Sequence, residues 1–313
     1  MIRVAACGIC GSDLGYVKLG GVAGPSGAPM PLGHELSGYV EAVGANVRGL
    51  TPGMPVVVNP MAAGNLIGNG GPEGGFAPWL LVRDARLGDG VHAIPDGLPL
   101  GVAALTEPLA VAMHAVNRAQ VKPDERVVVF GAGPIGLGIV AALRHRGIAD
   151  VVVVDPSALR LALARRLGAD AAINPAEASV SSLLAERHGG GEMFGWPVVE
   201  TDVYIDASGA PSVIPDVLGM CRRGARLIVV AVHKQPVAVD FRMVLAKEVH
   251  ITGAIGYPDE FPEALELLAQ RGGDLDALIS HRFPFADFAQ AFAVAEDPAV
   301  ALKVMVEFQA CPT

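Results

Sequence analysis

Four side chains that lie near glycine or proline residues carry donor atoms suited to zinc. They are the thiol of Cys10, the imidazole of His34 and the carboxylates of Glu35 and Glu107. Zinc takes sulfur, nitrogen and oxygen ligands, and a zinc ion with an open coordination position polarises a bound hydroxyl or carbonyl group. Residue types alone do not establish a metal site formed by these four residues, because Cys7 and Cys10 also have the CxxC spacing of a zinc knuckle or a redox motif.

A second group of residues has the pattern of a dinucleotide-binding loop. Gly131, Gly133 and Gly136 follow an apolar run, open a helical stretch, and precede an acidic residue, Asp155, by the expected distance. The glycines permit a tight turn and a close approach to a pyrophosphate at the helix N-terminus. Asp155 would accept hydrogen bonds from ribose hydroxyls and repel a 2′-phosphate, which favours NAD over NADP. The predicted cofactor-binding residues are Gly131, Gly133, Pro134, Ile135, Gly136, Asp155 and Arg160.

The elements that must position these residues fall into three segments. Residues 1–115 are rich in glycine and proline with short β-branched runs, which predicts a mainly β domain. Residues 116–255 alternate apolar strands with helical stretches, which predicts an α/β fold with a buried, doubly wound parallel sheet. Residues 256–313 are expected to return to the first domain, with helices near 260–271 and 285–296 and a strand near 302–308.

The composition limits the kinds of molecule that the protein is expected to bind. The chain has 313 residues, 51% of them hydrophobic, and a net charge of −9, which excludes disorder and argues against nucleic acid or a membrane surface. Four cysteines are too few for a secreted disulfide scaffold, and the start shows no export signal. We therefore expect a cytoplasmic protein with a small-molecule partner. Six histidines are expected to be solvated or packed without a site role, namely His92, His145, His188, His233, His250 and His281.

Two motifs resemble those of the zinc-containing medium-chain alcohol dehydrogenase family. One is the run Gly8-Ile9-Cys10-Gly11-Ser12-Asp13, and the other is Gly33-His34-Glu35-x-x-Gly38-x5-Gly44-x-x-Val47. The stretch 107–115 further resembles the sorbitol and threonine dehydrogenase branch. The resemblance covers essentially the whole chain. It implies a Rossmann NAD-binding domain at 116–255 and a GroES-like catalytic domain, shortened at its N-terminus and built from 1–115 and 256–313.

The same resemblance implies roles for individual residues. Cys10 and His34 would bind the catalytic zinc, with Glu35 and Glu107 as acidic ligands, one of which lies outside the first coordination sphere or exchanges with water. Glu35 would thus be catalytic as well as metal-binding. Ser12 would carry the proton of the substrate alcohol, and Asp13 would orient His34. The implied reaction is hydride transfer between a secondary alcohol or polyol and NAD.

Three features depart from the family pattern. The chain begins almost at the first motif, where relatives have further strands, so we expect an exposed sheet edge; a misassigned start, a covering partner or a compromised protein would account for it. Residues 54–78 contain no cysteine, so one catalytic zinc and no structural zinc are expected. Gly15 stands where many relatives have a relay histidine, so the final proton step would use water or another group.

Two other functions compete with this interpretation. The first is a zinc-free quinone or enoyl reductase of the same superfamily, against which Cys10, His34 and Asp155 argue. The second is a truncated nucleotide-binding pseudoenzyme, supported by the shortened N-terminus. The resemblance also implies a homodimer or homotetramer. The sequence does not identify which alcohol is the substrate.

Overall fold

The computed structural model describes residues 1–25 and 27–308, so Cys311 lies outside the described residues. The chain divides into two compact units. Unit 1 comprises Met1–Pro108 and the chain from Phe261 onward, and unit 2 is Leu109–Glu260. The domain borders that we expect from the sequence, after residues 115 and 255, lie a few residues from these.

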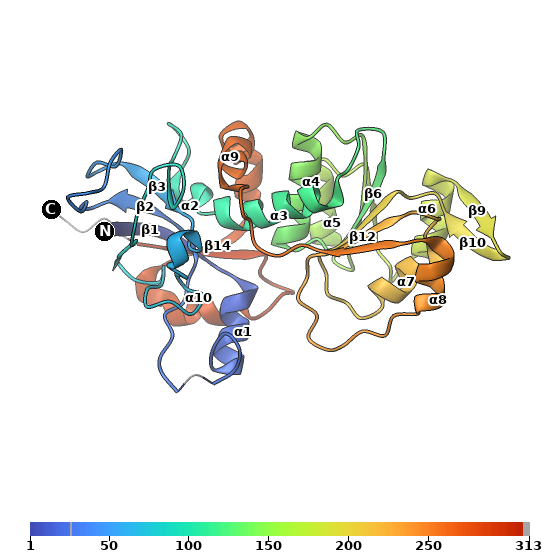
Figure 1. The fold of residues 1–313 in the computed structure, drawn as a ribbon, viewed down its shortest axis with the longest axis horizontal. Helices are drawn as coiled ribbons and strands as arrows, with labels where there is room; N and C mark the ends of the chain where they lie inside the picture. The colour runs from blue at the N-terminus through green and yellow to red at the C-terminus, as the bar shows by residue number, and fades with distance from the viewer. Residues whose placement is uncertain (26, 309–313) are drawn as a thin grey trace. The chain divides into compact units, whose positions relative to one another are not determined.

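Unit 1 is built on one sheet that joins the two ends of the chain. Its order is β14-β15-β1-β2-β3-β5, with β4 also paired to β1, so that β1 lies inside the sheet (Figure 1). The C-terminal strand β15 runs antiparallel to β1. The strands are β1 (Ile2–Ile9), β2 (Glu35–Val40), β3 (Pro55–Val58), β4 (Trp79–Leu80), β5 (Val91–Ala93), β14 (Ile279–Pro284) and β15 (Lys303–Glu307).

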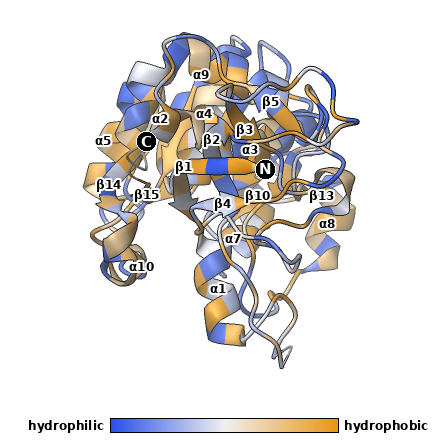
Figure 2. Cartoon of the chain, turned by 90° about the vertical axis from the view of Figure 1, so that its left-hand side faces the viewer, coloured by the Kyte–Doolittle hydropathy of each residue, from blue (hydrophilic) through white to orange (hydrophobic). Residues whose placement is uncertain are grey.

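The helices of unit 1 are α1 (Gly11–Leu19), α2 (Leu100–Ala103), α9 (Phe261–Leu275) and α10 (Phe288–Ala295), and α3 (Thr106–Ala119) begins there. The sequence did not predict α1, whose hydrophobic and hydrophilic residues are mixed along its length (Figure 2). Aliphatic side chains of β1, β2, β3 and β5 pack into one core. The stretch Leu100–Ala119 is long and apolar enough to cross a membrane, but 72% of its apolar 18-residue window is buried inside the structure, as in the core helix of a soluble protein.

Unit 2 has a six-stranded parallel sheet in the order β13-β12-β11-β6-β7-β8. This is the doubly wound Rossmann arrangement, so the predicted fold class is confirmed. Its strands are β6 (Arg126–Phe130), β7 (Asp150–Val154), β8 (Ala171–Ile173), β11 (Val203–Asp206), β12 (Arg226–Val229) and β13 (His250–Gly253). Its helices are α4 (Pro134–His145), α5 (Ala158–Leu167), α6 (Val180–His188), α7 (Val213–Met220) and α8 (Phe241–Lys247).

The central strands are continuous valine runs because both faces of a parallel sheet are covered by helices. Val127 to Val129 of β6 and Val151 to Val153 of β7 are fully buried. A hairpin of β9 (Gly190–Met193) and β10 (Trp196–Val199), which the sequence did not predict, lies apart from this sheet.

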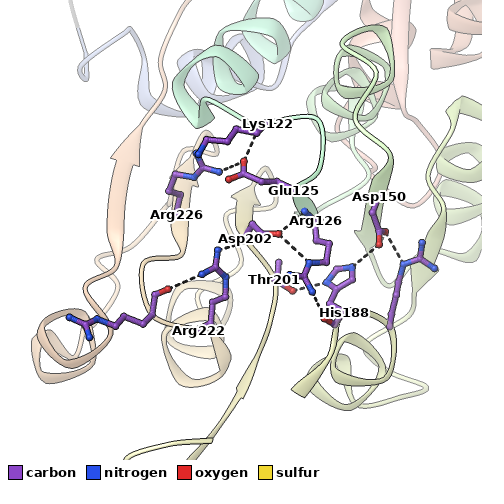
Figure 3. A network of polar contacts seen from close by, with 11 residues as sticks. Lys122, Glu125, Arg126, Asp150, His188, Thr201, Asp202, Arg222 and Arg226 are labelled. Carbon is purple, nitrogen blue, oxygen red and sulfur yellow. Dashed lines mark hydrogen bonds and ion pairs between the residues drawn. The ribbon is translucent and has the colours of Figure 1, made fainter. Parts of the chain in front are cut away.

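A network of polar contacts lies at the end of the parallel sheet where its strands begin (Figure 3). Asp202 accepts hydrogen bonds from the backbone N–H of Arg126 at 2.8 Å and from Arg222 Nη2 at 2.6 Å. Burial would raise the pKa of Asp202, but these bonds lower it below its ordinary value. His188 is buried in the same network, where its Nδ1 lies 2.7 Å from Thr201 Oγ1. This network ties strand beginnings together, away from the glycine-rich loop that follows β6.

Candidate active site

The pairing of β1 with β2 brings Cys10 and His34 together. Gly8 pairs with Glu35 in this antiparallel ladder, so the residue after β1 and the residue before β2 meet at one end of the sheet. Ligand atoms of Cys10, His34 and Glu35 all lie within 4.8 Å of one another. Ligands of one tetrahedral zinc lie roughly 3.3–3.8 Å apart, so small side-chain rotations suffice to bind the ion. A thiol, an imidazole and a carboxylate fit zinc chemically.

Asp13 fixes the backbone of both ligand segments. This fully buried carboxylate accepts hydrogen bonds from the backbone N–H of Cys10 at 2.9 Å and of Gly33 at 3.0 Å. Its Oδ1 lies 3.6 Å from His34 Nδ1, which is beyond a hydrogen bond but close enough for electrostatic attraction. Among the described residues, His34 Nδ1 has no hydrogen-bond partner. Asp13 therefore positions the ligands chiefly through their main chain.

The other ring nitrogen of His34 faces a hydroxyl group. Ser12 Oγ lies 3.2 Å from His34 Nε2. Burial, the largest influence, lowers the pKa of His34, but Asp13, Cys10 and Glu107 together raise it well above its ordinary value. The imidazole is therefore surrounded by negative charge, which also favours a cation among the same groups.

Tyr16 and Asn69 add neutral polar groups next to these residues. The Tyr16 hydroxyl, on α1, donates a hydrogen bond of 3.1 Å to Asn69 Oδ1, from the loop before β4. Burial raises the pKa of Tyr16, so its hydroxyl stays protonated at neutral pH.

Glu35 is paired with a buried lysine that sequence reasoning missed. Lys303 Nζ, at the start of β15, lies 2.6 Å and 2.7 Å from the two carboxylate oxygens of Glu35. Burial would lower the pKa of Lys303, but Glu35 and then Cys10 raise it above its ordinary value. The available signal was a single cation in the apolar run 301–306 that the sequence predicted as a strand.

Glu107 lies in the first turn of α3 and is buried. Its charge raises the pKa values of both His34 and Lys303. It is thus within electrostatic range of the cluster, although its carboxylate is not among the atoms within 4.8 Å. Both predicted acidic ligands therefore face the same group of residues.

The glycine-rich loop of unit 2 has the geometry that a dinucleotide site requires. Gly131 adopts a φ of +95°, and a Cβ at Gly136 would lie 1.9 Å from the carbonyl oxygen of Gly131. Either position is therefore restricted to glycine. Helix α4 begins after Gly133 with Pro134 at its first position, so the N–H groups of Ile135 and Gly136 belong to the first turn.

Asp155 joins this loop to the end of β7. Its Oδ2 accepts a hydrogen bond of 2.7 Å from the backbone N–H of Ala132, and its Oδ1 accepts one of 2.8 Å from that of Ser157. Asp155 lines, with Gly131 and Ser208, a cavity of about 810 Å³. Arg160 lies on the next helix, α5, where its backbone N–H donates to Ser157 Oγ at 3.4 Å.

A further pair of residues shapes the loop after β11, beside the glycine-rich loop. Buried Asp206 accepts hydrogen bonds from the backbone N–H groups of Ser208 and Gly209. Its second oxygen lies 3.0 Å from His233 Nε2. His233 is thus packed against a buried carboxylate at this end of the sheet.

Comparisons with known proteins match both units. Residues 1–96 match the alcohol dehydrogenase GroES-like domain, and residues 134–270 match the zinc-binding dehydrogenase domain. The chain belongs to the zinc-binding alcohol dehydrogenase family. It is 32% identical to L-idonate 5-dehydrogenase of Vitis vinifera, covering 97% of this chain and 86% of that protein. It is 31% identical to human sorbitol dehydrogenase, covering 98% and 88%.

Solved structures agree with this family. The crystal structure of 2R,3R-butanediol dehydrogenase from Bacillus subtilis has a TM-score of 0.81 at 29% identity, covering 98% of this chain and 91% of that one. An alcohol dehydrogenase from Escherichia coli complexed with NADH has a TM-score of 0.84 at 27% identity and the same coverages. The predicted family and the predicted alcohol or polyol oxidoreductase activity are confirmed. Zinc and NAD(H) are the general cofactors of such family members.

Proposed function

We propose that this member of the zinc-binding alcohol dehydrogenase family is an NAD-linked dehydrogenase of secondary alcohols, polyols or vicinal diols that uses one catalytic zinc. The observation that carries the proposal is the cluster of Cys10, His34 and Glu35 ligand atoms within 4.8 Å, with a serine hydroxyl 3.2 Å from the histidine. Donor chemistry of this kind selects zinc, and the hydroxyl supplies a path for a proton.

Cys10 and His34 would hold the metal, and Glu35 and Glu107 are the carboxylates available to complete its ligand set. Asp13 keeps the two ligand segments in place through their backbone N–H groups. When bound, zinc polarises the substrate oxygen and the nicotinamide exchanges hydride with the carbon that carries it. No structural zinc is proposed, because residues 54–78 contain no cysteine.

Ser12 would handle the proton of the substrate hydroxyl. Its Oγ can accept that proton in a hydrogen bond while its own proton passes to solvent or to a cofactor ribose hydroxyl. Gly15 provides no side chain for a further relay. Tyr16 stays protonated at neutral pH, so it would orient a substrate hydroxyl rather than act as the base.

The cofactor would be NAD, bound through Gly131, Gly133, Pro134, Ile135, Gly136, Asp155 and Arg160. A Cβ at Gly133 would meet no protein atom within 4 Å, so the loop leaves room for a pyrophosphate at the start of α4. Asp155 keeps acceptor capacity for ribose hydroxyls although each oxygen already accepts one backbone N–H. Its negative charge disfavours the 2′-phosphate of NADP.

The proposed substrate class follows from the relatives and from the polar pair beside the site. Relatives carry the names of sorbitol, idonate and butanediol dehydrogenases, which act on molecules with neighbouring hydroxyl groups. The hydrogen-bonded Tyr16 and Asn69 would offer neutral polar groups to a second substrate hydroxyl. We further propose a homodimer or homotetramer in the cytoplasm.

The test is a coupled assay of NAD reduction with sorbitol, 2,3-butanediol and a primary alcohol, before and after removal of metal by a chelator. The expected result is NADH formation with a polyol or diol, loss after chelation, and recovery on adding zinc. Activity that survives both chelation and the Cys10→Ala substitution would overturn the proposal. Reduction of quinones with NADPH instead would favour the zinc-free reductase.

A further inference from the structure

Asp206 is a fully buried carboxylate at the end of β11 in unit 2. Its Oδ1 accepts hydrogen bonds from the backbone N–H of Ser208 at 3.0 Å, from Ser208 Oγ at 2.8 Å and from the backbone N–H of Gly209 at 3.1 Å. Its Oδ2 lies 3.0 Å from Nε2 of His233, whose side chain is 15% exposed. Because a carboxylate only accepts hydrogen bonds, Nε2 of His233 is the donor in this pair.

The main chain of Asp206 is bound to the same loop that carries His233. Its carbonyl oxygen accepts hydrogen bonds of 3.0 Å from the N–H groups of Val230 and of Ala231, which follow β12 directly. The side chain and the main chain of one residue therefore tie the loop after β11 to the loop after β12. We call the side-chain part of this arrangement the Asp206–His233 latch.

The loops after β6, β11 and β12 lie against one another. A Cβ at Gly131, in the loop after β6, would lie 2.9 Å from the backbone of Ser208, in the loop after β11. A Cβ at Gly209 would lie 3.3 Å from the Cβ of Ala231 and from the carbonyl oxygen of Val232, in the loop after β12. The two loops that the latch joins are thus packed beside the glycine-rich loop at the carboxyl end of the sheet.

The strand order places the latch in one half of the doubly wound sheet. Strands β6, β7 and β8 follow one another in one direction, and β11, β12 and β13 in the other, so the order reverses between β6 and β11. Such a sheet consists of two mononucleotide-binding halves, and a dinucleotide lies across the carboxyl ends of the strands at the reversal. Asp155, directly after β7, belongs to the half proposed to bind the adenosine ribose. The half with the latch is left for the mononucleotide that carries the nicotinamide.

From this geometry we propose that the Asp206–His233 latch positions the loops that bind the nicotinamide mononucleotide half of NAD. The latch holds the backbone N–H and C=O groups of both loops in one arrangement before the cofactor arrives, so less conformational entropy is lost on binding. His233 acts through the loop that carries it and is therefore a positioning residue. The inference rests on the proposed use of NAD.

Loss of the His233 imidazole is expected to affect the two halves of the site unequally. Oδ2 of Asp206 would lose its donor, and a buried carboxylate oxygen without a partner is costly, so water would enter and the loop after β12 would gain freedom. Binding would have to remove that freedom again. The adenosine half keeps its own hydrogen bonds, from the backbone N–H groups of Ala132 and Ser157 to Asp155. Its arrangement should therefore persist.

The experiment measures dissociation constants of NADH and of AMP by calorimetry with the full chain, without turnover. NADH spans both halves of the site, whereas AMP contains only the adenosine half. His233→Ala is expected to weaken NADH binding at least about tenfold while the AMP constant stays within about twofold of the wild type. Asp155→Asn, on the adenosine side, is expected to weaken AMP binding as well. His250→Ala, at an exposed position where β13 begins, is the matched control and should change neither constant.

Two further variants distinguish the latch from a general loss of structure. His233→Gln places an amide N–H donor near the position of Nε2, so it is expected to recover most of the NADH affinity. In an Asp206→Asn background, His233→Ala is expected to have a clearly smaller effect on NADH binding, because the charged acceptor is absent. If His233→Ala does not fold, His233→Leu, which fills the space without a donor, takes its place.

The outcomes separate the latch from the cofactor proposal on which it rests. Equal weakening of NADH and AMP binding in His233→Ala, or unchanged NADH binding, would overturn the latch while the wild type still binds NADH. Equal effects of His233→Ala in both backgrounds would also overturn it. Failure of the wild type to bind NADH would overturn the proposed use of NAD. A selective loss of NADH affinity that His233→Gln recovers supports the latch.

Discussion

Asp13 Oδ1 accepts a hydrogen bond of 3.0 Å from the backbone N–H of Gly33, the residue before His34. The other oxygen of the same carboxylate holds the backbone N–H of Cys10. One buried side chain thus fixes the separation of the two segments that carry Cys10 and His34. The preorganisation of the candidate metal site depends on this carboxylate.

Asp13→Asn is expected to weaken zinc binding by about 10–100-fold, because the amide group has one acceptor oxygen for two N–H donors. The unpaired buried N–H group should also cost about 1–3 kcal/mol of unfolding free energy. Chelator competition and thermal unfolding measure the two effects. Asp84→Asn, at an exposed position, is the matched control and should change neither. Wild-type zinc affinity in Asp13→Asn would contradict the positioning role.

Ser12→Ala is expected to lower kcat on the order of 10²–10⁴-fold, because the proton of the substrate alcohol loses its acceptor. Zinc content should stay unchanged, since the hydroxyl contacts His34 without being a proposed ligand. Ser12→Thr keeps a hydroxyl group and should retain most of the activity. Steady-state kinetics together with metal analysis make the test, and a kcat within threefold of the wild type in Ser12→Ala would exclude the proton-transfer role.

Asp155→Asn is expected to shift cofactor preference toward NADP. The substitution keeps the size of the side chain and removes the negative charge that repels a 2′-phosphate, at the cost of one of its two backbone hydrogen bonds. The ratio of kcat/KM for NADP to that for NAD should therefore rise about tenfold. Asp216→Asn, on the same cavity, serves as the control and should leave this ratio unchanged. An unaltered ratio in Asp155→Asn would mean that other groups select the cofactor.

His188 is expected to make stability depend on pH. Burial, as the main cause, lowers the pKa of His188 below its ordinary value in the folded protein. The unfolded chain therefore binds the proton more readily, and the free energy of unfolding should fall as pH drops below about 6.5.

Chemical unfolding of the wild type and His188→Gln between neutral pH and pH 5 measures this dependence. The variant should lose part of the decline, whereas substitution of the exposed His250 by glutamine should not. Parallel declines in the wild type and in His188→Gln would show that another group, such as buried His92, is responsible.

The sequence predicted the strands and helices of unit 2 well, because the patterns that specify them involve residues close together along the chain. Valine runs bounded by glycines specify buried parallel strands, and the loop from Gly131 to Gly136 can be recognised without tertiary information. The β9–β10 hairpin was not predicted because its turn, Phe194-Gly195, is not a typical hairpin-turn sequence. Phe194 has a positive φ of 53°, a conformation that a phenylalanine rarely adopts. Helix α1 escaped because glycines interrupt its sequence.

The candidate site was predictable only where its residues lie in motifs. Cys10 and His34 can be found from their neighbours, but the partner of Glu35 comes from a strand 268 residues away. Such a long-range pair depends on the order β15-β1-β2, which no local pattern encodes. For the same reason the role of Asp206 in holding the loop near His233 was not predicted.

Elemental analysis of the purified wild-type chain and of Cys10→Ala, with Cys221→Ala as the matched control, tests the central claim most directly. Cys221 is a buried cysteine far from the proposed ligands in sequence and lies in unit 2. The account predicts one zinc per chain in the wild type and in Cys221→Ala, and loss of zinc in Cys10→Ala. Folded wild-type protein that holds no zinc after supplementation, or undiminished zinc in Cys10→Ala, would contradict it.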